Sequence, residues 1–208
     1  MRKAYLFVFG VFLLIGCKEK ESTFYYSLYG KNDLLIEKNK YIQTLSKVKE
    51  NEYLLTILGN KYKESLKIKI DSIGLYRYCD NHYILTHHFD SIENQTFCKS
   101  SPPFLYKKAY WVRKKKYFIR NKPYEIVCFS EISSSESSNS TYYLKGFGFI
   151  CYYYYKVNKY ILCDSINNVD FNLQVLHEIN NSLIHDTTIF ERYVVKYPKM
   201  KFWPPNEK

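Results

Sequence analysis

Short runs of β-branched and aromatic residues recur along most of this chain and limit what it can fold into. In the run 65–71, the aliphatic side chains of Leu66, Ile68 and Ile70 alternate with polar ones, among them two lysines. Such period-two alternation is typical of a β-strand with one buried face and one face in water. The pattern therefore favours a sheet over a helical fold.

Similar runs predict further strands, separated by short polar breaks such as Gly59-Asn60-Lys61. Because short connections join antiparallel neighbours, we expect successive strands to pair as a meander. The expected strands are 41–47, 52–58, 62–70, 73–78, 83–89, 105–112, 116–120, 124–132, 142–155 and 160–164. The predicted class is mainly β, an antiparallel meander forming a twisted sheet or an open barrel.

Two segments depart from the strand pattern. Residues 133–140 are nearly all serine with other polar residues, which predicts a loop. Over residues 171–182, apolar side chains at four-residue spacing predict one short C-terminal helix, and Asp170 is its expected N-terminal cap. The predicted apolar stripe consists of Phe171, Val175, Ile179 and Leu183.

The N-terminus has the three parts of an export signal. Arg2 and Lys3 precede an apolar run over residues 4–16, which ends at Cys17. A helix of that length spans about 20 Å, too little for a hydrocarbon core of about 30 Å. A secretory signal peptide is therefore favoured over a stable membrane-spanning helix.

The residues Leu14-Ile15-Gly16-Cys17 resemble the lipobox of bacterial lipoproteins, in which an apolar and a small residue precede the cysteine. The resemblance implies cleavage before Cys17, lipidation of its sulfur and acylation of the new N-terminus, for instance by palmitate. Two or more acyl chains anchor a protein stably, whereas one anchors it only marginally. Lys18, in place of an aspartate, implies the outer membrane, at its periplasmic face or at the cell surface. The alternatives are an ordinary cleaved signal, or an uncleaved anchor with an incidental cysteine.

These features divide the chain into a signal peptide (1–16), a lipidated tether (17–23) and a single β-rich domain with a C-terminal tail (24–208). The stretch 114–165 also resembles small β-rich lipoproteins of the Bacteroidota type, in which an Asn-Gly-Lys turn joins two strands. Here Asn121-Lys122-Pro123 lacks the glycine of that turn, which argues against a two-residue type I′ turn. The resemblance implies no activity.

Five cysteines follow Cys17, and an odd number outside the cytoplasm leaves at least one unpaired or paired between chains. A three-residue hairpin loop at 156–158 would place Cys151 directly opposite Cys163, close enough for a disulfide. The alternative is that all five are small buried residues with free thiols. None has the spacing of zinc ligands, and we predict no metal or other cofactor.

The positive charge is concentrated in one segment. The chain carries a net charge of +11, and residues 94–124 contain no Asp or Glu, whereas bases and acids balance over the rest of the mature chain. Aromatic residues interleave with these bases, a combination that suits an anionic envelope polymer, an acidic protein or lipid head groups. Nucleic acid is not an expected partner in the envelope. The predicted surface consists of Lys107, Lys108, Trp111, Arg113, Lys114, Lys115, Lys116, Arg120 and Lys122. The alternative is that the lysines protect exposed edge strands from aggregation.

Catalytic patterns are missing from the sequence. HExxH, GxSxG, GxGxxG and the phosphate-binding P-loop pattern are all absent. His82, His87 and His88 lie near one expected strand, but surface histidines explain them better than a metal site. We therefore expect a lipid-anchored envelope lipoprotein without enzymatic activity, acting by binding or structural support. The alternatives are an immunity or inhibitor lipoprotein directed against a toxin, and an envelope hydrolase assembled from distant strands.

Overall fold

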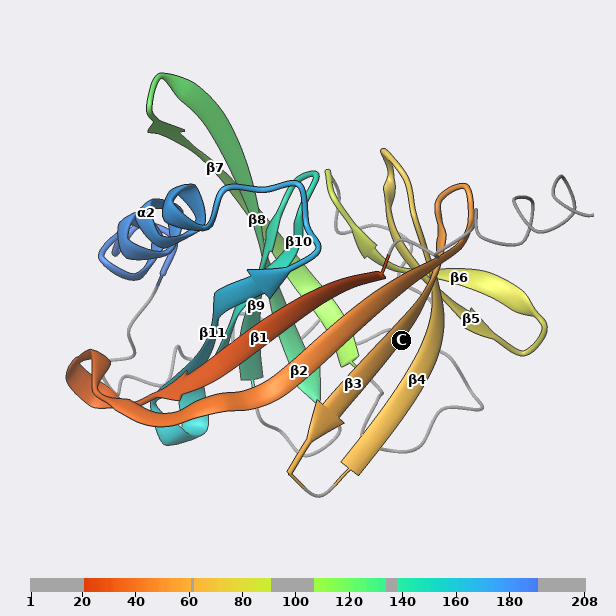
Figure 1. The fold of residues 1–208 in the computed structure, drawn as a ribbon, viewed down its shortest axis with the longest axis horizontal. Helices are drawn as coiled ribbons and strands as arrows, with labels where there is room; N and C mark the ends of the chain where they lie inside the picture. The colour runs from red at the N-terminus through yellow and green to blue at the C-terminus, as the bar shows by residue number, and fades with distance from the viewer. Residues whose placement is uncertain (1–20, 61, 91–106, 134–137, 191–208) are drawn as a thin grey trace, which may run out of the picture.

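The computed structural model describes residues 21–60, 62–90, 107–133 and 138–190 (Figure 1). They form one antiparallel sheet of eleven strands with a short C-terminal α-helix, which confirms the predicted mainly β meander. The sheet is open, with β6 and β7 at its edges. The strands are β1 (Glu21–Tyr29), β2 (Leu35–Lys49), β3 (Glu52–Gly59), β4 (Tyr62–Ile70), β5 (Gly74–Cys79), β6 (His82–His88), β7 (Lys107–Ile119), β8 (Lys122–Ser133), β9 (Ser138–Leu144), β10 (Gly148–Tyr154) and β11 (Lys159–Asn167). The helix is α2 (Leu173–Ile184), and two 3-10 turns are η1 (Lys31–Asp33) and η3 (Tyr155–Val157).

The first strand lies in the middle of the sheet, the next five lead to one edge, and the last five lead from the opposite edge back to the first. β1 pairs with β2 on one side, and β2 to β6 follow in order to one edge. β7 forms the opposite edge, and β8 to β11 lead back until β11 pairs antiparallel with β1. The first and last strands, β1 and β11, are therefore neighbours in the sheet, whereas β6 and β7, which are consecutive in the chain, lie at its opposite edges.

Several strand boundaries differ from those expected. β1 was not among the expected strands, and it begins at Glu21, inside the range 17–23 that was predicted as the tether. β7 runs without a break where two strands were expected. The single expected strand 142–155 is instead β9 and β10, separated by a turn in which Gly146 has a positive φ of 77°.

The predicted serine loop is also too long, because β9 begins at Ser138. Ser140 is only 2% exposed, and its hydroxyl exchanges a hydrogen bond of 2.6 Å with the hydroxyl of Tyr155. A buried hydroxyl needs such a partner. Ser140 can be buried in this strand because the fold places the Tyr155 hydroxyl within hydrogen-bond distance of it.

The β7–β8 hairpin turns at Arg120 and Asn121, which have positive φ values of 51° and 62°. Ile119 pairs with Lys122, so the connection has two residues. Positive φ at both central positions is what a two-residue type I′ turn requires. The argument against such a turn is therefore wrong: asparagine tolerates the left-handed region, and the turn lies one residue earlier than expected.

The β10–β11 connection removes the predicted disulfide. Four residues lie between the paired Tyr154 and Lys159, so Cys151 is opposite Leu162. A shift of one residue turns Cys163 to the other face of the sheet. Both thiols are free, and the predicted pairing of Cys151 with Cys163 is wrong. Cys79, by contrast, is disulfide-bonded.

Helix α2 covers one face of the strands β8 to β11. Its buried residues Val175, Ile179 and Leu183 confirm most of the predicted apolar stripe. The helix begins two residues later than expected, however, because the side chain of Asn172, not Asp170, caps it by accepting hydrogen bonds from the Gln174 and Val175 amides. Within the part of the chain that the structure describes, no helix is long and apolar enough to cross a membrane.

The opposite face of β8, β9 and β10 is covered by the other end of the sheet. Phe89, directly after β6, is 3% exposed, and its ring stacks on Tyr143 of β9 with centroids 4.8 Å apart. Asp90 forms an ion pair with Lys114 of the edge strand β7. The sheet therefore curls until its β6 end reaches the face of β8 and β9.

Candidate functional site

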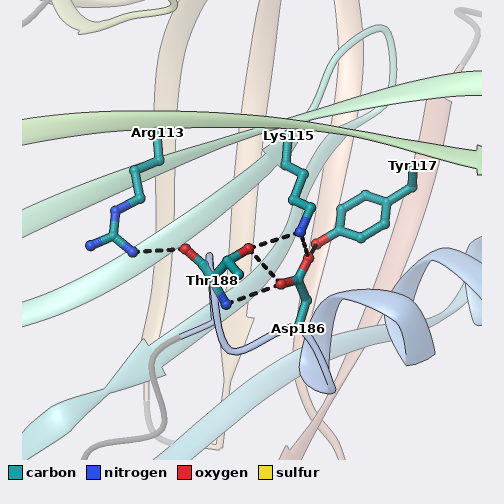
Figure 2. A network of polar contacts seen from close by, with 5 residues as sticks. All are labelled: Arg113, Lys115, Tyr117, Asp186 and Thr188. Carbon is teal, nitrogen blue, oxygen red and sulfur yellow. Dashed lines mark hydrogen bonds and ion pairs between the residues drawn. The ribbon is translucent and has the colours of Figure 1, made fainter.

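The basic strand β7 faces the segment that follows α2 (Figure 2). Arg113 donates to the Thr188 carbonyl oxygen at 2.9 Å, and Lys115 donates to the Thr188 hydroxyl at 2.8 Å. Asp186 forms an ion pair with Lys115 and accepts a hydrogen bond of 2.8 Å from the Tyr117 hydroxyl. Residues 113, 115 and 117 alternate along a strand and so share one face, which explains why all three reach the same segment.

This network changes the acidity of its members. Burial would raise the pKa of Asp186, but the hydrogen bonds from Lys115, Thr188 and Tyr117 outweigh it and hold that pKa well below its usual range. Burial, and then the hydrogen bond to Asp186, raises the pKa of Tyr117 well above its usual value. Asp186 is therefore a carboxylate at neutral pH, and the protonated Tyr117 hydroxyl donates a hydrogen bond to it.

Other predicted surface bases also have partners inside the chain. Arg120 forms an ion pair of 2.6 Å with Glu178 of α2, and Lys114 pairs with Asp90. Lys116 lies opposite Glu125 in the β7–β8 ladder and, like Lys122, is exposed. Much of the predicted anionic-partner surface therefore holds the fold together. The side chains of Lys107, Lys108 and Trp111 lie outside the described part, as does Cys17.

A groove of about 690 Å³ lies between α2 and the strands β1 and β11. β11 supplies Asp164, α2 supplies Asn180 and His177, and β1 supplies Tyr29. Successive side chains of a strand point to opposite faces of the sheet, so Tyr160 and Asp164, four residues apart in β11, both face the helix. The groove therefore gathers polar groups from three elements that are distant in sequence.

Two acceptor oxygens in the groove lining lack donors among the described residues. Asn180 is 4% exposed, and its Nδ2 donates to the Cys163 carbonyl oxygen at 2.7 Å, but its Oδ1 accepts from no described group. Asp164 accepts from the Tyr29 hydroxyl at 3.3 Å through Oδ2, while its buried Oδ1 likewise has no described donor. Buried polar atoms nearly always have partners, so these two call for an explanation.

Tyrosine rings flank the acceptors. Tyr29 and Tyr160 stack with centroids 5.2 Å apart and an interplanar angle of 8°. The Tyr160 hydroxyl donates to Asp33 at 2.7 Å. Burial raises the pKa of Tyr29 to about 12, together with the negative charge of Asp164 and the hydrogen bond to it. The Tyr29 hydroxyl therefore keeps its proton at neutral pH. The groove thus combines aromatic faces with acceptor oxygens.

The histidines form no metal site in the described part of the chain, where no three His, Cys, Asp or Glu side chains gather. His82 contacts the Asp80 carbonyl oxygen, and the His87 ring packs edge-on against Phe129 at 4.8 Å. His88 accepts a hydrogen bond from the Asp90 amide. His177 contacts the Asp164 carbonyl oxygen at 2.8 Å.

Sequence reasoning missed the groove. One signal was present: Asn180 lies four residues after Leu176, on the same side of α2 as the apolar stripe. A polar residue on an apolar face needs a partner, which marks it for attention. No local pattern marked Tyr29 and Asp164, which lie 135 residues apart.

No protein-family model, no curated protein and no solved structure matches the chain.

Proposed function

We propose that this protein is a lipid-anchored lipoprotein of the cell envelope, held at the outer membrane, that acts by binding a partner and not by catalysis. The observation that carries the proposal is the position of Leu14-Ile15-Gly16-Cys17 just before the sheet. β1 begins at Glu21, so at most about 14 Å of extended chain separates an acylated Cys17 from the sheet. The disulfide at Cys79 is compatible with an oxidising compartment outside the cytoplasm.

The groove beside α2 supports a binding role. It offers aromatic faces and acceptor oxygens, the combination by which proteins orient small ligands. Its histidine ring contacts a main-chain carbonyl oxygen and its Tyr29 hydroxyl donates to a carboxylate, so these groups serve to fix the lining. A rigid lining suits recognition.

The anchor is tested by replacing the lipidated cysteine in a Gram-negative host. Cys17→Ser removes the sulfur that receives lipid, so we expect a precursor that keeps its signal and takes up no labelled palmitate. Gly16→Ala is the matched control, because it keeps a small residue before the cysteine and should be processed and labelled normally. Palmitate incorporated into the Cys17→Ser chain would contradict the anchor.

A narrower anionic-partner surface is the second candidate. Lys116 and Lys122 are exposed near the end of the β7–β8 hairpin, on its two faces. Phe118, which is 73% exposed, shares the face of Lys116. A cationic and aromatic surface of this kind suits an anionic polymer or an acidic protein. Arg113 and Lys115 are excluded from it because they hold Asp186 and Thr188.

The test is retention on an anionic matrix such as heparin. Lys116→Gln with Lys122→Gln should elute at lower salt, because fewer counterions are released on binding. Lys47→Gln with Lys63→Gln removes the same charge from exposed positions of β2 and β4 and is the control. Equal shifts for the two double variants would show that net charge alone causes retention.

A further inference from the structure

The groove beside α2 contains acceptor oxygens that no described donor serves. Asp164 and Asn180 each have one oxygen without a described donor, and both residues line the groove. Two hydroxyls of the lining donate elsewhere: Tyr29 donates to Oδ2 of Asp164, and Tyr160 donates to Asp33. A ligand that completes this site must therefore bring donors.

The charges of the lining also favour a cationic ligand. Asp33 and Asp164 are its carboxylates and Lys38 is its lysine, while His177 contacts a main-chain oxygen. Lys38 forms no ion pair with Asp164 among the described residues. A donor that is itself charged gains a stronger, charge-assisted hydrogen bond with Asp164 than a hydroxyl would.

A primary ammonium group fits this lining in number and shape. It carries three N–H donors, enough for Asp164, Asn180 and a tyrosine oxygen. A carboxylate turns readily about its Cβ–Cγ bond, so either oxygen of Asp164 can meet a donor in the groove. The neighbouring faces of Tyr29 and Tyr160 add the attraction of an aromatic ring for a cation.

We infer that the groove between α2, β1 and β11 is a binding site for the primary ammonium group of a small molecule, with Asp164 as its counter-ion and Asn180 as its neutral acceptor. The inference deepens the proposed binding role and rests on it, but it does not depend on the lipid anchor. The ammonium group would be the common hydrogen-bond donor to the Asp164 and Asn180 oxygens that lack described donors.

The experiment measures binding of tyramine and ethanolamine to the full chain in detergent, by equilibrium dialysis and saturation-transfer NMR at neutral pH. We expect both amines to bind and their N-acetyl derivatives, which keep the shape but lose the charge, to bind at least about tenfold more weakly. Equal binding of free and acetylated forms would overturn the inference and point to recognition of neutral groups. Absence of binding by either amine would also overturn it.

A pair of matched variants locates the site. Asp164→Asn keeps the side-chain shape but removes the charge, and should weaken amine binding about tenfold or more. Asp170→Asn makes the same change at an exposed position outside the groove and should leave binding unaltered. If Asp164→Asn binds amines as tightly as the parent chain, the inference fails.

The anchor and the groove are tested separately by the Cys17→Ser chain. Amine preference retained without acylation supports the groove whatever the fate of the anchor. An acylated parent chain that lacks amine preference would overturn the groove inference alone and leave the lipoprotein proposal standing.

Discussion

The strands on the two sides of β1 follow the same antiparallel rules, yet they are buried to very different degrees. In β8, the four consecutive residues 126–129 are each 2% exposed or less. In β3, no residue is buried, and Leu58 is 37% exposed. The difference lies in what covers the sheet: α2 packs on one face of β8 to β11, and the curled β6 end covers the other face of β8, β9 and β10. The residue pattern of the strands is enough to form a sheet, but its side chains form a buried core only where other elements cover the faces of the sheet.

The largest expected effect comes from the same substitution made on each side of this contrast. Leu176 in α2 is fully buried, so Leu176→Ala should lower the free energy of unfolding by about 3 kcal/mol, through lost burial and the cavity that remains. Leu58→Ala should cost less than about 1 kcal/mol, because that side chain is already partly in water. Urea denaturation measures both, and similar losses would refute the contrast.

The contact that curls the sheet should show an intermediate effect. Phe89→Ala removes the ring that stacks on Tyr143, and we expect a loss of about 2–3 kcal/mol, below the range for a central phenylalanine because the sheet end can relax. Hydrogen exchange should quicken in β5 and β6 and stay slow in β9 and β10. The exposed Phe118→Ala is the control. Uniformly faster exchange would show instead that both sides of the sheet unfold as one unit.

The smallest effect is expected at the carboxylate that joins β7 to the segment after α2. Asp186→Asn removes the charge that pairs with Lys115 and should cost about 1–2 kcal/mol at neutral pH. The folded pKa of Asp186 lies below its unfolded value of about 3.9, so its contribution is present above that pH and is lost as the pH falls further.

Denaturation curves at several pH values check this sign. The difference between the parent chain and Asp186→Asn should be constant from neutral pH down to about pH 5 and should shrink below about pH 4. Asp170→Asn, at an exposed position, should show little effect at any of these pH values. A difference that grows on acidification would contradict the assigned role of Asp186.

Local sequence predicted those parts of the fold that depend on local spacing. The alternation around Ile68 predicted β4 with its exact residues, because adjacent strand side chains point to opposite faces. The four-residue spacing of Val175, Ile179 and Leu183 predicted the buried stripe of α2. The Cys151–Cys163 disulfide was wrong because one extra residue in a turn reverses the face of every side chain beyond it.

The sequence by itself determined a mainly β meander with one C-terminal helix, since periodicity and turn residues act over a few neighbours. Only the tertiary structure decided that β11 returns to β1, that the bases of β7 find acids near α2, and that Tyr29, Asp164 and Asn180 share a groove. Contacts between residues more than a hundred positions apart depend on the curl and order of the whole sheet, which no local pattern encodes.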